Sequence, residues 1–141
     1  MIVLDTNVLS ELMRSEPHPA VFAWTAGQSR GELYTTSVNV AEILYGIAAL
    51  PAGRRRSSLA ALAQAMFAED FIGRILPFDD EAAAQYAEIM VLRRRQGRPI
   101  EAFDAQIAAI TLVSKADLAT RDITDFVGCG LSLIDPWTIR L

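Results

Sequence analysis

The chain begins Met1-Ile2-Val3-Leu4-Asp5-Thr6-Asn7, and this stretch decides the fold. Residues 2–4 are wholly apolar, which is typical of a strand buried on both faces of a parallel sheet. Asp5 ends the run, so it places a carboxylate at the carboxyl end of that strand. A helical pattern follows directly, over residues 7–13.

The same alternation of strand and helix continues to the end of the chain. Further strands are expected at 33–36, 75–78, about 118–120 and 131–134, and further helices at 19–26, 38–50, 54–68, about 79–95 and 100–114. Ser37 and Asp79 or Asp80 suit the N-caps of two of these helices, and Pro77 suits a strand at the sheet edge. The alternation predicts one α/β domain over residues 1–141, with a parallel sheet covered on both faces.

Composition limits the possible chemistry. The 141 residues are 52% apolar and 21% charged, which is typical of one globular domain. No apolar stretch is long enough to cross a bilayer and no basic leader precedes Asp5, so we expect a soluble, cytoplasmic protein with no membrane partner. Cys129 and His18 are the only residues of their types, which excludes an intrachain disulfide, a thiolate metal site and a histidine pair. Carboxylates must carry any chemistry.

Four carboxylates stand where a parallel sheet gathers its ligands, beyond the carboxyl ends of the strands. Asp5 and Asp122 each follow an expected strand. Glu42 lies five residues after Ser37, and its long side chain can reach back toward the strand ends. Asp104 lies near the positive end of its helix. Each acid alone is readily explained as a cap or a solvated charge, but together the four account for the whole net charge of −4.

The neighbourhoods of Glu42 and Asp104 suggest a bound cation. Both are set among apolar residues, so we expect both to be buried, and no Lys or Arg lies at helical spacing to neutralise either one. An all-oxygen cluster without histidine or thiolate suits Mg²⁺ or Mn²⁺ rather than Zn²⁺. With such an ion, the expected reaction is hydrolysis of a phosphodiester by an activated water molecule.

Four motifs carry a family resemblance: residues 1–9, 36–46, 104–108 and 118–126. In this order and at these separations they resemble a PIN-domain ribonuclease, and more narrowly a VapC-type toxin of the FitB-like branch. The resemblance extends to Asp135-Pro136-Trp137. It implies a three-layer α/β/α fold with a five-stranded parallel sheet of order 3-2-1-4-5, a Mg²⁺ or Mn²⁺ site, endonucleolytic cleavage of RNA, and neutralisation by a VapB-like antitoxin.

The resemblance also implies roles for individual residues. It assigns catalysis and metal binding to Asp5, Glu42, Asp104 and Asp122. Thr120 would support this cluster with its hydroxyl group and Asn7 would orient it with its amide. Family members carry Asp or Asn at the position of Asp122 and usually Asp at that of Asp125; we expect Asp122 at the metal site and Asp125 in a structural or auxiliary role. Independently of the resemblance, the position of Arg121 next to Asp122 in the sequence suits it to bind phosphate or to pair with a site carboxylate.

Other surface features suggest partners less specifically. Arginines gather at residues 54–56 and 93–95, where they could position RNA, or could simply be solvated and complement a helix end. The helices expected at 38–50 and 54–68 are apolar on more than one face, which favours a homodimer and a hetero-oligomer with the antitoxin. Trp137 is expected to serve packing rather than base stacking.

Two rival functions remain open. The first is another Mg²⁺-dependent phosphoryl enzyme, a phosphatase or a receiver-like switch. Asp5-Thr6-Asn7 lacks the second acid of the aspartyl-phosphatase pattern, and no suitably placed lysine completes a receiver. The second is a catalytically inactive binding module on the same scaffold, although an inactive copy should have lost carboxylates that this chain retains.

Overall fold

The structure is a computed structural model that describes residues 1–139 of the chain; the last two residues of the predicted domain, 140 and 141, lie outside the described part. Five parallel strands form one sheet in the order β3-β2-β1-β4-β5, which confirms the predicted order. The strands are β1 (Ile2–Leu4), β2 (Leu33–Thr36), β3 (Ile75–Leu76), β4 (Asp117–Ala119) and β5 (Leu133–Ile134). The strand with the decisive apolar run, β1, is therefore the central one.

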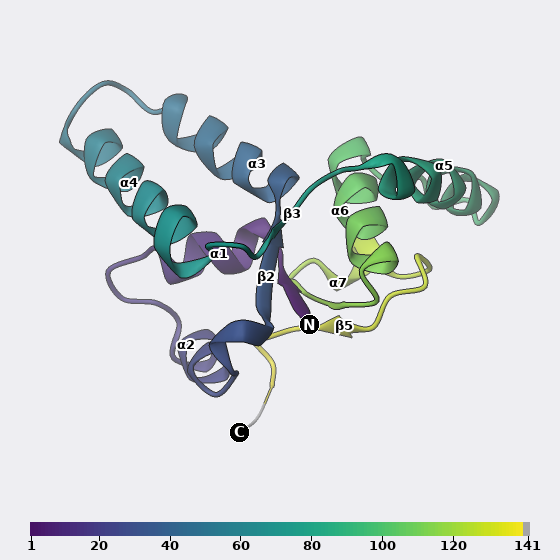
Figure 1. Cartoon of the computed structure of the whole chain (residues 1–141), viewed down its shortest axis with the longest axis horizontal. Helices are drawn as coiled ribbons and strands as arrows, with labels where there is room; N and C mark the ends of the chain where they lie inside the picture. The colour runs from purple at the N-terminus through teal and green to yellow at the C-terminus, as the bar shows by residue number, and fades with distance from the viewer. Residues whose placement is uncertain (140–141) are drawn as a thin grey trace.

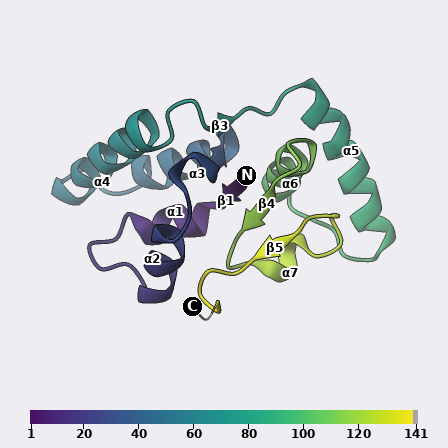
Figure 2. The same cartoon turned by 60° about the horizontal axis from the view of Figure 1, so that its bottom comes forward.

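Helices cover both faces of this sheet (Figures 1 and 2). They are α1 (Thr6–Leu12), α2 (Pro19–Ala26), α3 (Ser37–Ala48), α4 (Arg54–Ala65), α5 (Asp80–Arg95), α6 (Ala102–Val113) and α7 (Ile123–Phe126), with a short 3-10 turn η1 (Arg30–Glu32) and a π-helical turn η2 (Met66–Asp70). The first four helices lie to one side of the sheet and the last three to the other. No helix in residues 1–139 is long and apolar enough to span a membrane.

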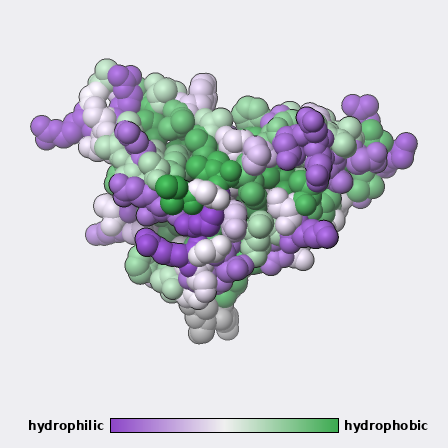
Figure 3. All heavy atoms as spheres, in the orientation of Figure 1, coloured by the Kyte–Doolittle hydropathy of each residue, from purple (hydrophilic) through white to green (hydrophobic). Residues whose placement is uncertain are grey.

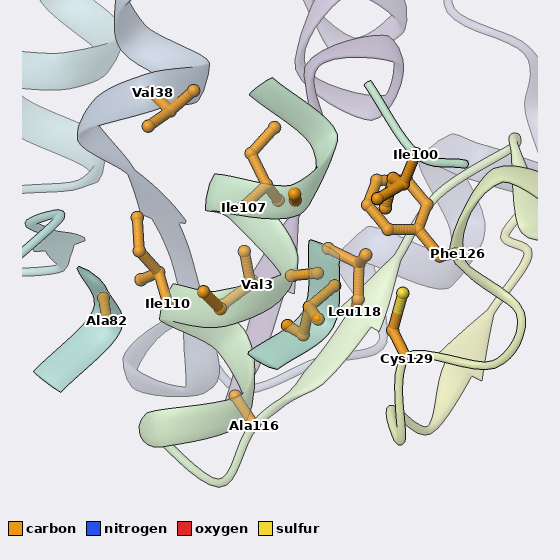
Figure 4. Close-up of a cluster of buried hydrophobic side chains, with 14 residues drawn as sticks. Val3, Val38, Ala82, Ile100, Ile107, Ile110, Ala116, Leu118, Phe126 and Cys129 are labelled. Carbon is orange, nitrogen blue, oxygen red and sulfur yellow. The ribbon is translucent and has the colours of Figure 1, made fainter. Parts of the chain in front are cut away.

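Two hydrophobic cores result, one on each face of the sheet. Neighbouring residues of a strand point to opposite faces. Val3 therefore packs with α5 and α6, in the cluster that contains Ile107 and Phe126 (Figure 4). Leu4 packs with α1 to α4, in the cluster that contains Val8. Val3 and Leu4 are both completely buried, so β1 belongs to both cores.

Several predicted boundaries differ from the observed ones. Strand β3 is two residues shorter than predicted because its pairing with β2 ends at Leu76, directly before Pro77, which has no N–H to donate. Strand β5 covers only the second half of the predicted 131–134. Helix α3 is capped by Thr36 rather than Ser37, since the Thr36 side chain accepts from the N–H of Asn39. The short helix α7 lies between the last two predicted strands, where no helix was predicted.

Arg93 has a different role from the predicted ones. The sequence suggested a solvated residue that complements a helix end or binds RNA, but Arg93 is only 3% exposed. Its Nε donates to the carbonyl oxygen of Arg98 and its Nη1 to that of Asp125, both at 2.7 Å. The guanidinium thus joins the end of α5 to the segment that follows β4. Arg94 and Arg95, by contrast, are exposed.

Replacing Arg93 should destabilise the protein. Arg93→Met would leave two carbonyl oxygens without their donor, at a cost of about 2–4 kcal/mol in the free energy of unfolding. Arg94→Met, the adjacent exposed position, is the matched control and should change it by less than about 0.5 kcal/mol. Urea unfolding followed by circular dichroism measures both. Equal midpoints for the two variants would contradict the structural role of Arg93.

Candidate functional site

The site is built where β1 and β4 end side by side. Leu4 pairs with Ala119 in parallel register, and the N–H of Asp5 donates to the carbonyl of Ala119 at 2.9 Å. The next residues of the two strands, Asp5 and Thr120, therefore meet. The hydroxyl of Thr120 donates to Oδ2 of Asp5 at 2.7 Å.

The carboxylate of Asp5 is buried, with 5% of its surface exposed, and three donors hold it. Besides Thr120, the backbone N–H of Thr6 donates to its Oδ1 at 2.8 Å, and Nδ2 of Asn39 donates to the same oxygen at 3.1 Å. Asn39 is itself oriented by Thr36, whose hydroxyl donates to its Oδ1 at 2.7 Å. The position of Asp5 is thus determined jointly by α1, α3 and the end of β4.

Glu42 reaches back toward the strand ends, as its length suggested. The hydroxyl of Thr6 donates to its Oε1 at 3.0 Å and accepts a hydrogen bond from Nδ2 of Asn39 at 3.0 Å. Glu42 is half-buried, not fully buried as expected, because it faces an open pocket and because α3 leaves apolar neighbours such as Leu44 and Tyr45 exposed.

Asp122 lies on the Thr120 side of Asp5, whereas Glu42 lies on the Thr6 side. Nδ2 of Asn7 donates to its Oδ2 at 3.1 Å, while Oδ1 of Asn7 accepts from the N–H of Arg121 at 3.2 Å. The N–H of Asp122 donates to Oγ1 of Thr120 at 3.0 Å. Asp122 lines the pocket and Asp125 does not; the Asp125 backbone instead receives the hydrogen bond from Arg93.

One pocket of about 630 Å³ brings the four sequence-predicted acids together. Its lining consists of Asp5, Thr6, Asn7, Ser10, Glu11, Arg14, Glu42, Asp104, Arg121, Asp122 and Trp137. The acids come from the ends of β1 and β4 and from helices α3 and α6. Trp137 packs partly against the core, as expected, but it also lines this pocket.

Sequence reasoning missed several of the residues that support the site. Asn39 is fully buried and links Asp5 to Thr6. Its signal was an amide inside the otherwise apolar run Val38-Asn39-Val40, three residues before Glu42. Glu11 gave no such signal, because its burial depends on how α1 packs.

Burial raises the pKa values of three acids of the site, and the charges of neighbouring acids add to the effect. Burial, and then repulsion by Asp5, Asp125, Glu42 and Asp122 in that order, raises the pKa of Asp104 from 3.8 to about 7. Burial is also the main cause of the raised pKa values of Asp5 and Glu42. The pocket therefore holds more negative charge than the chain itself compensates.

The donor chemistry of the pocket fits a hard divalent cation. Within residues 1–139 no three acidic, histidine or cysteine side chains converge closely enough to enclose an ion by themselves. Mg²⁺ commonly takes only one or two carboxylates directly and completes its shell with water and substrate phosphates. The pocket offers carboxylate oxygens, uncompensated negative charge and access to solvent. It therefore meets the coordination needs of Mg²⁺.

Comparisons with known proteins identify the family of the chain. Residues 2–126 match the model of the PIN domain. VapC ribonuclease Y4jK of Sinorhizobium fredii is 42% identical over 97% of this chain and 98% of its own length. Toxin FitB of Neisseria gonorrhoeae is 36% identical over 97% of this chain and 99% of its own.

A solved structure of FitAB bound to a DNA fragment contains a chain that superposes with a TM-score of 0.93. The two chains are 35% identical, and the match covers 100% of this chain and 99% of the other. The chain therefore belongs to the PIN domain family, and within it to the group that includes VapC ribonuclease and FitB toxin.

Proposed function

We propose that this protein is a Mg²⁺- or Mn²⁺-dependent endoribonuclease and the toxin of a VapBC-type toxin–antitoxin pair. The observation that carries the proposal is the single open pocket shared by the four carboxylates Asp5, Glu42, Asp104 and Asp122. Relatives named as VapC ribonuclease and tRNA(fMet)-specific endonuclease VapC support RNA as the substrate.

The four acids would hold the ion or ions. A bound divalent cation would supply an activated water for in-line attack on a phosphodiester and neutralise charge on the leaving oxygen. The chain's own residues bind these carboxylates and orient them. Three hydrogen bonds keep the Asp5 carboxylate in one position, and Asn7 holds Asp122. Glu42 is held by the Thr6 hydroxyl. Such prior orientation lowers the reorganisation needed for reaction.

An antitoxin and a second copy of the chain are the proposed protein partners. Helices α3 and α4 flank an apolar groove of about 750 Å³ lined by residues such as Leu44, Ile47 and Phe67. Tyr45, on α3, is 77% exposed. Figure 3 shows hydrophobic surface gathered in the upper half of this view. Solved FitAB complexes, 35% identical in the matching chain, support a VapB-like antitoxin as one partner.

Replacing Asp5 should abolish RNA cleavage. Asp5→Asn removes a buried negative charge from the proposed metal site, and the loss of several kcal/mol of charge stabilisation corresponds to a rate at least about 100-fold lower. The assay incubates antitoxin-free protein with total cellular RNA in Mg²⁺, in Mn²⁺ and in EDTA, and sequences the cleaved ends. Discrete cuts should appear in wild-type protein only with metal.

The matched control is Asp117→Asn, at the opposite end of β4. It should cleave like the wild type. Undiminished cleavage by Asp5→Asn would contradict the proposed mechanism. RNA that stays intact under every condition, with folded wild-type protein, would contradict the nuclease. Hydrolysis of a chromogenic phosphate ester would then favour another phosphoryl hydrolase. A Tm that does not shift with metal would favour an inactive binding module.

Replacing Asp104 should stabilise the metal-free protein at high pH. The folded state binds the Asp104 proton more tightly than the unfolded state, so stability falls as pH rises from about 4 to about 7 and then levels off. Asp104 is only half-buried, and solvent screening reduces this cost to about 1 kcal/mol. In EDTA, Asp104→Asn should therefore raise Tm by roughly 4 °C at about pH 8 and leave it unchanged at about pH 4.

Thermal unfolding by circular dichroism at the two pH values measures this difference, with Asp117→Asn as the control that should not reproduce it. If the Asp104→Asn protein melts at or below the wild-type temperature at the higher pH, then burial and the neighbouring acids do not disfavour the charge of Asp104 as the geometry indicates.

A further inference from the structure

We propose that Arg121 binds a phosphate of the RNA strand next to the bond that is cut, and that Trp137 is the positioning residue that holds the Arg121 guanidinium for this purpose. The inference rests on the proposed function. It names the group that attracts an RNA strand into an otherwise acidic pocket.

The Arg121 side chain is held at both its base and its tip. At the base, its backbone N–H donates to Oδ1 of Asn7, which also orients Asp122. At the tip, Cζ lies 5.1 Å from the centroid of the Trp137 ring, which is cation–π distance. Trp137 is anchored in turn, because its backbone N–H donates to Oδ1 of Asp135 at 2.9 Å and its ring packs against the core on the α1 to α4 side.

Within the described part of the chain, the side-chain donors of Arg121 have no partner. Among residues 1–139 no carboxylate lies within 4.0 Å of its guanidinium, and no acceptor receives a hydrogen bond from its side chain, although Asp122 is its neighbour and the pocket is acidic. The other arginine of the pocket, Arg14, pairs with Glu11 at 3.0 Å. Of the two roles that the sequence left open for Arg121, pairing with a carboxylate is therefore not the one observed.

A guanidinium with free donors suits a phosphate. Its planar fork of N–H groups matches two phosphate oxygens, and a ring stacked against its face leaves the edge donors available. The pocket lining contains more carboxylates than guanidinium groups, and the chain carries a net charge of −4, so an RNA strand is repelled unless a cation receives it. Arg121 is exposed and lines the same pocket as Asp122, which would place the bound phosphate beside the reacting one.

The test measures binding of a short single-stranded RNA by fluorescence anisotropy in Ca²⁺, over a range of salt concentrations. Arg121→Met should weaken binding about tenfold and reduce the slope of log K against log salt by about 0.7, the value for one phosphate contact on a single strand. Arg121→Lys keeps the charge, so it should keep the slope, but it should bind several-fold more weakly because it lacks the fork.

Trp137 is tested by a conservative and a disruptive variant. Trp137→Phe retains an aromatic face and should bind like the wild type, whereas Trp137→Leu should weaken binding without changing the slope, because the charge remains and only its position is lost. Arg30→Met is the matched control, since Arg30 precedes the amino end of β2, whereas the site lies at the carboxyl ends of β1 and β4. It should change neither quantity. Circular dichroism verifies that each variant is folded.

Binding is measured separately from cleavage, so the two proposals can fail separately. If Arg121→Met binds RNA like Arg30→Met, with the same slope, the phosphate role of Arg121 is wrong even if the wild type cleaves RNA. If the wild type binds RNA through Arg121 but never cleaves it, the proposed nuclease is wrong, while the contact between Arg121 and an RNA phosphate stands. With active protein, Arg121→Met should raise KM more than it lowers kcat.

Discussion

The structure depends on one buried carboxylate. Burying the charge of Asp5 is costly unless donors surround it, and the three that do come from different elements: the first turn of α1, Asn39 on α3 and Thr120 at the end of β4. Thr120 reaches Asp5 only because β4 pairs in parallel with β1. Asn39 reaches it only because α3 packs against the strand end. The same contacts that complete the fold therefore also build the site.

Much of this arrangement was predictable from sequence, for identifiable reasons. A short, wholly apolar run is typical of a strand covered on both faces, so β1 was found correctly, and the sheet order implied by the family resemblance is the observed one. Acids that follow strands must gather at one edge of a parallel sheet, so the pocket contains Asp5 and Asp122 as expected. The prediction of β1 and the prediction that Asp5 and Asp122 share an edge both rest on local sequence patterns. Neither depends on how the loops run or how the helices pack.

The residues that sequence reasoning missed depend on packing between distant segments. Asn39 meets Asp5 across 34 positions of the chain, and Arg93 meets the carbonyl of Asp125 across 32. A buried amide and a buried guanidinium resemble surface residues until their partners are known. Trp137 illustrates the same limit, because its position in the pocket depends on where the chain after β5 lies.

The two hydrophobic cores give the site one more property. Thr6 and Glu42 come from helices of the core that contains Leu4, whereas Asp104 comes from the helix that packs on Val3. The acidic cluster thus lies at the boundary between the two cores, where β1 and β4, the strands followed by Asp5 and Asp122, each contribute residues to both. Loosening of either core would separate acids on one side from acids on the other, so the proposed metal site requires that both cores be packed at once.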